Sequence, residues 1–203
     1  MENRQQHWDA VYMMKQPHQV SWTQVQPSIS LGFIGETGLP TTSSIIDIGG
    51  GDSRLVDCLL ALGFTDLTVL DISKAAIDRA RARLGGLSDL VTWIVADVEE
   101  FVPSRSYDLW HDRATFHFLT TASQVEAYVA KASVAVSGYM TIGTFSENGP
   151  DRCSGLPVRQ YSEDTLSSAL AKGFKKIRCL HEDHVTPFNT VQNFLFCNFR
   201  KAS

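Results

Sequence analysis

The sequence predicts an α/β protein whose sheet is doubly wound, mostly parallel and covered by helices on both faces. Strand-like and helix-like segments alternate repeatedly from residue 44 onward, which is typical of parallel strands joined by right-handed helical crossovers. Three consecutive glycines, Gly49–Gly51, directly follow the first strand-like segment. They place a sharp turn at the carboxyl edge of the sheet, where this fold binds its ligands.

The expected elements follow one another in a regular order. The first strand is apolar and β-branched, and the helix after it begins near Ser53 and stops at Gly63. Ser73 caps the next helix, which ends at Gly85. Thr121 has the spacing of a capping box and Ser162 begins a helix that stops at Gly173. The expected strands are 45–48, 67–72, 91–96, 107–111 and 139–145, and the expected helices are 54–62, 74–84, 121–136 and 162–172.

Two long β-like runs close the chain, Lys175–Val185 and Asn193–Arg200, and a turn containing Pro187 and Asn189 joins them. The short link predicts an antiparallel hairpin. We therefore expect an antiparallel strand at the end of an otherwise parallel sheet.

Composition excludes several classes of function. A chain of 203 residues, 43% of them hydrophobic, suits one domain with a substantial core. The formal net charge of -4 argues against nucleic acid and anionic membranes as partners, and no apolar run reaches the length of a membrane span. The N-terminus lacks the apolar core of a signal peptide. The four widely spaced cysteines predict neither a zinc site nor a disulfide framework, so a reducing, cytoplasmic setting is expected. They are Cys58, Cys153, Cys179 and Cys197.

Carboxylates on both sides of the glycine turn decide which nucleotide ligand it suits. The dinucleotide fingerprint requires a third glycine where Arg54 stands, and no GK[ST] phosphate loop follows. Asp47 and Asp52 flank the turn, and they would repel phosphates but attract a cationic ligand.

Two further acids end the next two strands of the expected sheet. Asp71 ends the second strand, where a carboxylate can hold both ribose hydroxyls, and Asp97 ends the third, within reach of an adenine edge. The ligand that these positions imply has a ribose and an adenine, carries positive charge and lacks phosphate. S-adenosylmethionine fits that description.

With these motifs the sequence resembles the class I, or seven-β-strand, S-adenosylmethionine-dependent methyltransferases. DIGGGDS (Asp47–Ser53) resembles the first motif of that family, and LDIS (Leu70–Ser73) carries the ribose acid. VADVEEF (Val95–Phe101) resembles the adenine motif. YDLWHDRATFHFL (Tyr107–Leu119) resembles the fourth-strand motif that borders the transferred methyl group.

The resemblance implies an architecture and a domain organisation. The sheet would have seven strands, the last of them antiparallel. The whole chain, 1–203, would form a single methyltransferase domain, with an N-terminal lid segment at 1–43 and a Rossmann-like core at 44–203. HWDAVY (His7–Tyr12) and SWTQ (Ser21–Gln24) resemble the segment that covers the cofactor in bacterial small methyltransferases and some lysine methyltransferases.

The resemblance also implies a set of site residues. Asp112 and His117 are candidates to orient or deprotonate the methyl acceptor. The alternatives are that Asp112 pairs with Arg113 or caps the following turn, and that His117 packs among Phe116, Phe118 and Leu119. The implied contacts with S-adenosylmethionine are Asp47, Gly49, Gly50, Gly51, Asp71, Ile72, Asp97, Val98, His111 and Trp22. His181 and His184 form an HxxH pattern, but on a strand they would point to opposite faces, so no metal site is expected.

Three functions remain open from the sequence. The first is a methyltransferase acting on a small molecule, favoured because a lid containing Trp8 and Trp22 suits a closed pocket. The second is a protein lysine methyltransferase. HDRATF (His111–Phe116) resembles the Asp-Lys-Gly-Thr segment of certain such enzymes but departs from it at Arg113 and Ala114. The third is a cofactor-binding protein without turnover. The expected partner is a small-molecule substrate, and the oligomeric state stays open.

Overall fold

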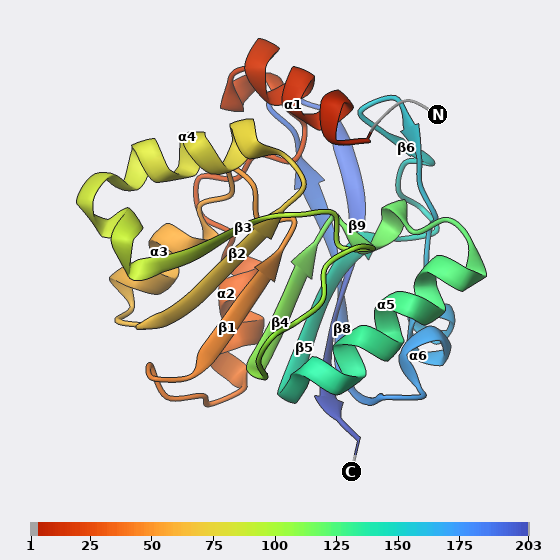
Figure 1. Cartoon of the computed structure of the whole chain (residues 1–203). Helices are drawn as coiled ribbons and strands as arrows, with labels where there is room; N and C mark the ends of the chain where they lie inside the picture. Colours follow the sequence, from red (N-terminus) through yellow and green to blue (C-terminus); the bar gives the residue numbers. More distant parts are fainter. Residues whose placement is uncertain (1–3, 203) are drawn as a thin grey trace.

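The computed structural model describes residues 4–202, and its centre is one seven-stranded sheet (Figure 1). The strand order is β3-β2-β1-β4-β5-β9-β8. The first five strands are parallel, whereas β9 runs antiparallel between β5 and β8. The strands are β1 (Ser44–Ile48), β2 (Asp66–Asp71), β3 (Val91–Val95), β4 (Tyr107–Arg113), β5 (Val136–Phe145), β8 (Phe174–Val185) and β9 (Val191–Lys201). The predicted fold class is confirmed.

Helices cover both faces of the sheet and bury two apolar clusters. Side chains of α2 and α3 pack on one face with Leu84 at the end of α4, and α5 and α6 pack on the other (Figure 1). The helices are α1 (Arg4–Met14), α2 (Ser28–Glu36), α3 (Leu55–Ala61), α4 (Lys74–Leu84), α5 (Ala122–Ala135) and α6 (Glu163–Leu170). Short 3-10 helices are η1 (Pro17–Gln19), η2 (Gly85–Leu90) and η3 (Phe116–Phe118), and a small hairpin joins β6 (Arg152–Cys153) to β7 (Leu156–Pro157).

Local signals explain where the core helices begin. The hydroxyl of Ser73 accepts a hydrogen bond from the Ala76 amide at 3.1 Å at the start of α4. Thr121 and Gln124 form the expected capping box at the start of α5. Each cap satisfies an amide that has no partner within its helix.

The two N-terminal helices have no such clear pattern in the sequence. Helix α2 contains Gly32 and Gly35, which lower helix propensity. It forms because Phe33 and Ile34 are buried against the sheet, where the Asn198 side chain also donates to the Phe33 carbonyl at 2.9 Å. This helix therefore packs as part of the core, although it falls within the 1–43 segment expected to form the lid. The predicted lid is therefore limited to residues 4–26.

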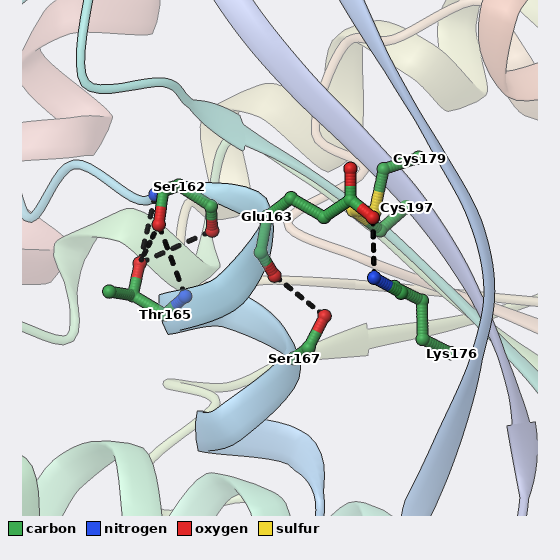
Figure 2. The surroundings of a disulfide bond; sticks show 7 residues. All are labelled: Ser162, Glu163, Thr165, Ser167, Lys176, Cys179 and Cys197. Carbon is green, nitrogen blue, oxygen red and sulfur yellow. Dashed lines mark hydrogen bonds and ion pairs between the residues drawn. A yellow bond between two sulfur atoms is a disulfide. The ribbon is translucent and has the colours of Figure 1, made fainter.

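A disulfide links β8 to β9, contrary to the expectation that no disulfide would form (Figure 2). Cys179 and Cys197 lie directly opposite each other in the antiparallel register, with Cα atoms 4.1 Å apart. The spacing of 18 residues does not reveal this register, because it depends on how the hairpin pairs. Cys58 and Cys153 are free thiols. Disulfides are rare in a reducing cytoplasm, so the cytoplasmic setting stays a prediction.

The same close-up shows how α6 is fixed to the hairpin (Figure 2). Ser162 and Thr165 cap its first turn, and Glu163 forms an ion pair with Lys176 on β8.

None of the helices within residues 4–202 is long and apolar enough to cross a membrane.

Candidate active site

The glycine turn after β1 is pressed against two carboxylates. Gly49 and Gly51 have positive φ angles of +64° and +46°. A Cβ atom on Gly50 would lie 2.6 Å from the Asp47 carboxylate, and one on Gly51 would lie 2.8 Å from that of Asp71. Only glycine fits a turn of this shape and closeness, so its backbone forms a cradle between the two acids.

Asp47 is held by a buried hydrogen-bond network. Neighbouring strands β1 and β4 place it level with His111, whose Nδ1 donates to its carboxylate at 2.7 Å. The other ring nitrogen of His111 lies 2.9 Å from the Ser30 hydroxyl of α2. All three side chains are buried. The network fixes one carboxylate at the methionine end of the expected cofactor site.

Asp71 ends β2 and is only 6% exposed. Its carboxylate accepts a hydrogen bond from the Ser73 amide at 2.7 Å. Burial raises the pKa of Asp71 to about 7, an effect that the Ser73 amide opposes and the nearby charge of Asp47 reinforces. A buried carboxylate of this kind is stabilised in its charged form by a ligand that supplies hydrogen-bond donors or positive charge.

Helix α1 lies across the carboxyl ends of the strands and covers these acids (Figure 1). Arg4 donates to Asp97 at 2.5 Å, and Asp9 accepts from the Ser73 hydroxyl at 2.7 Å. The Tyr12 hydroxyl lies 3.0 Å from the position of a Cβ atom on Gly51. The three side chains reach from one helix to the ends of β2 and β3.

The segment after α1 is tied down by aromatic and polar contacts. The ring of Trp22 meets those of Trp8 and Tyr12 at centroid distances of 5.8 and 6.2 Å. Its carbonyl accepts a hydrogen bond from Arg113 at 2.8 Å. On β8, His184 Nε2 lies 2.6 Å from the Ser21 carbonyl. Residues 4–26 therefore lie closed over the edge of the sheet.

Two cavities remain beneath and beside this segment. The smaller, of about 30 Å³, is lined by the glycine turn, Asp47, His111, Tyr12, Trp22 and Arg113. The larger, of about 590 Å³, lies between residues 12–25, the start of α3, helix α4 and Pro187. Arg113 and Trp22 line both. The small cavity has room for little more than a water molecule, so a nucleoside can enter only if α1 moves.

The two catalytic candidates lie outside both cavities. The Asp112 carboxylate accepts hydrogen bonds from the Tyr128 hydroxyl at 2.7 Å and from the Thr115 and Phe116 amides at 3.0 Å. Burial raises its pKa to about 6. It points to the opposite face of β4 from His111, because side chains alternate along a strand. The structure thus supports the alternative in which Asp112 caps the turn, though Arg113 is not its partner.

His117 is fully buried and stacks on Phe145 at a centroid distance of 4.5 Å. Among the described residues, neither of its ring nitrogens has a hydrogen-bond partner. Burial, helped by the nearby charge of Arg113, lowers its pKa to about 3, so the imidazole is neutral.

The structure brings most of the predicted cofactor residues to one edge. Asp47, Gly49, Gly50, His111 and Trp22 line the small cavity. Gly51 and Asp71 lie beside Tyr12, and Asp97 is paired with Arg4. Ile72 is half-buried after β2, and the Val98 side chain packs into the core. Within residues 4–202 no group of three or more His, Cys, Asp or Glu side chains is placed to hold a metal ion.

Three residues of this edge were not predicted as site residues. Ser30 and Arg113 were missed because their roles depend on how α2 and the lid pack on the sheet. Tyr12 lies within the HWDAVY motif, and that motif was the only signal of its position.

The strand order, the glycine turn and the acids at its sides are those of a doubly wound α/β protein with a candidate nucleoside-binding edge. A family model described as "Methyltransferase domain" matches residues 46–136. The matched span runs from β1 to the end of α5 and so contains the predicted cofactor residues other than Trp22.

Two curated relatives are similar to this chain. Malonyl-[acyl-carrier protein] O-methyltransferase of Anoxybacillus flavithermus is 38% identical over 89 residues, which cover 43% of this chain and 34% of that protein. Malonyl-[acyl-carrier protein] O-methyltransferase 1 of Ilyobacter polytropus is 24% identical over 163 residues, covering 75% and 60%. The chain therefore spans less than two thirds of either relative.

A solved structure is similar over the whole length. The N-methyltransferase NodS of Bradyrhizobium japonicum, in complex with S-adenosylhomocysteine, has a TM-score of 0.74 at 15% identity, and 100% of both chains is covered. Residues 46–136 thus match a methyltransferase domain, and the chain as a whole has the fold of this solved methyltransferase.

Proposed function

We propose that this protein transfers a methyl group from S-adenosylmethionine to a small molecule. The observation that carries the proposal is the cradle of Gly49–Gly51, closed on either side by the carboxylates of Asp47 and Asp71. A side chain at either of the last two glycines would meet a carboxylate oxygen. The two buried carboxylates beside this backbone attract a cationic nucleoside and repel the phosphates of a dinucleotide.

The residues present fit the cofactor. Asp71 would accept hydrogen bonds from the ribose hydroxyls, and Asp97 with its neighbours Ile72 and Val98 would border the adenine. Asp47, His111 and Trp22 would lie at the methionine end. A cationic ligand near Asp71 would favour its charged form and so offset the burial that raises its pKa.

When bound, the cofactor supplies an activated methyl group on a sulfonium, which needs little chemical help to leave. The protein then acts by holding the acceptor in line and keeping water out. Trp8, Tyr12, Trp22 and Phe118 form an aromatic cluster that can do both. Their rings meet edge to face or tilted, at centroid distances from 5.4 to 6.4 Å.

The larger cavity supports a small acceptor. Its volume of about 590 Å³ falls within the range of small-molecule sites, roughly 300–1,000 Å³. The two curated relatives are named as O-methyltransferases of a malonyl group, which supports methyl transfer as the reaction class. Asp112 has no part in the proposed mechanism, because its carboxylate already accepts hydrogen bonds from two amides of the turn and from the Tyr128 hydroxyl. His117 stays an untested candidate: it is fully buried outside the larger cavity and would reach an acceptor only after the side chains around it move.

Calorimetry tests cofactor binding. S-adenosylmethionine and S-adenosylhomocysteine should bind to the full chain and NAD should not. Asp71→Ala should weaken both by about tenfold or more, because hydrogen bonds to a charged group contribute roughly 1.5–3 kcal/mol each. NAD binding without adenosylmethionine binding would contradict the proposal.

Labelled S-adenosylmethionine then identifies the acceptor class. The protein should label a component of a metabolite extract. Labelling of lysine in a protein extract instead would establish the protein lysine methyltransferase. Tight cofactor binding without labelling in either extract would indicate a binding protein.

A further inference from the structure

Arg113 is a cation without a counter-ion at the edge of the proposed methyl-transfer site. It ends β4 on the same face as His111 and lines both cavities. No other lysine or arginine lines the small cavity. In the part of the chain that the structure describes, its guanidinium donates one hydrogen bond, to the Trp22 carbonyl, and forms no ion pair.

The acids nearby do not neutralise Arg113. The Asp47 carboxylate is engaged by His111 at 2.7 Å. Burial lowers the pKa of Arg113, and the more distant charges of Asp47 and Glu182 only partly oppose this effect. An arginine remains charged, with five donors in a planar fork. A half-buried cation with one neutral partner is incompletely solvated, and a ligand can provide the missing charge.

Two other arginines at the same edge have acidic partners. Arg83 pairs with Asp52 and Asp57, and Arg79 lies 3.9 Å from Asp52. Arg54 also lines the large cavity and forms no ion pair within residues 4–202, but its side chain is exposed to solvent, so Arg113 is the half-buried arginine at this edge that lacks an acid. Arg113 lines both the small cavity at the glycine turn and the large cavity. Its guanidinium can therefore contact a molecule bound in the large cavity.

We propose that Arg113 binds a carboxylate carried by the methyl acceptor, so that the substrate class is a small organic acid. This inference rests on the proposed function. Arginine and carboxylate match in shape and can form two parallel hydrogen bonds. The bound acid would also separate Arg113 from the sulfonium, which is itself a cation. An uncharged analogue would leave both cations facing each other, and the site therefore selects against it.

Benzoate and its uncharged isostere benzamide test the proposal as probes. Each is titrated calorimetrically into the full chain saturated with S-adenosylhomocysteine. We expect wild type to bind benzoate at least about tenfold more tightly than benzamide. Arg113→Gln should lose that preference, and Arg113→Lys should keep part of it. Arg105→Gln removes an equal charge at an exposed pair with Asp66, at the opposite end of the strands, and should behave as wild type.

Each outcome decides between the alternatives. Equal affinity for the two probes, or no binding of either, overturns the inference even if no Arg113 variant folds. A further outcome is that Arg113→Gln weakens the binding of S-adenosylhomocysteine itself and leaves the binding of 5′-methylthioadenosine unchanged. Arg113 would then hold the carboxylate of the cofactor, and the inference is wrong. Failure of wild type to bind S-adenosylhomocysteine at all would count against the proposed function, a result separate from the probe preference.

Discussion

His111 and Asp47 form a buried pair, with 2.7 Å between the ring Nδ1 and the carboxylate Oδ1. Replacing His111 by Leu leaves the Asp47 carboxylate and the Ser30 hydroxyl buried without this partner. We expect the free energy of unfolding to fall by roughly 1–3 kcal/mol, measured by urea denaturation. Ser30→Ala is the matched control and should cost less, because His111 keeps its bond to Asp47. Equal stability of His111→Leu and wild type would contradict the role of this pair.

Asp71 should make the stability of the unliganded protein depend on pH. Its pKa is about 7 in the folded chain, against an ordinary value of 3.8, so between these values the folded state holds a proton that the unfolded state has lost. Stability attributable to Asp71 is therefore lost as pH rises from about 4 to about 7. Asp71→Asn removes the carboxyl group and with it this pH dependence. Melting temperatures are measured at about pH 5 and about pH 8, and the value for the variant minus that for wild type should be larger at the higher pH. A difference that is the same at both pH values would argue against the raised pKa.

Asp112 and His117 should respond oppositely to substitution. Asp112→Ala leaves the Tyr128 hydroxyl and two amides without their acceptor and should destabilise the fold by about 1–3 kcal/mol. His117→Phe removes two buried nitrogens that have no partners, so stability should hold or rise. Melting curves and turnover are compared for both. Reduced turnover in a stable His117→Phe variant would assign it a role in the reaction, and wild-type turnover would remove it from the candidates.

The lid should respond to the cofactor. In the closed arrangement Tyr12 lies beside Gly51 and Arg4 pairs with Asp97, so a ligand must first lift α1 and then pack beneath it. Hydrogen exchange across residues 4–26 should slow when S-adenosylhomocysteine is added. Helix α5 lies on the other face of the sheet and serves as the internal control. Unchanged exchange in the lid, with ligand bound, would show that these residues do not cover it.

The cystine of β8 and β9 predicts a thiol count and a stability difference. Alkylation of the unfolded chain without reductant should modify two of the four cysteines, Cys58 and Cys153, and reductant should expose the other two. Closing a loop of 18 residues stabilises a fold by roughly 3 kcal/mol in the chain-entropy account, so reduction should lower the melting temperature. Cys58→Ser controls for loss of a thiol alone. Four reactive thiols without reductant would show that the bond does not form.

Short-range patterns determine much of this protein from the sequence alone. The glycines and acids at strand ends, the caps at Ser73 and Thr121, and the strand-helix alternation all act within a few residues. Their consequences could therefore be predicted. The order of these signals along the chain predicts the sheet. It also predicts that the acids lie together at one edge, because parallel strands bring their carboxyl ends together whatever lies between them.

Only the tertiary structure decides features that depend on contacts across long separations. The pairing of Cys179 with Cys197 needs the hairpin register, and helix α2 is stabilised by burial despite its glycines. The face of β4 to which each side chain points separates His111 and Arg113 from Asp112, although the three are consecutive or nearly so in sequence. The position of α1 pairs Arg4 with Asp97, whereas Arg113 forms no ion pair within residues 4–202. Local propensity contains no information on such partners, since each is fixed by the packing of the whole chain.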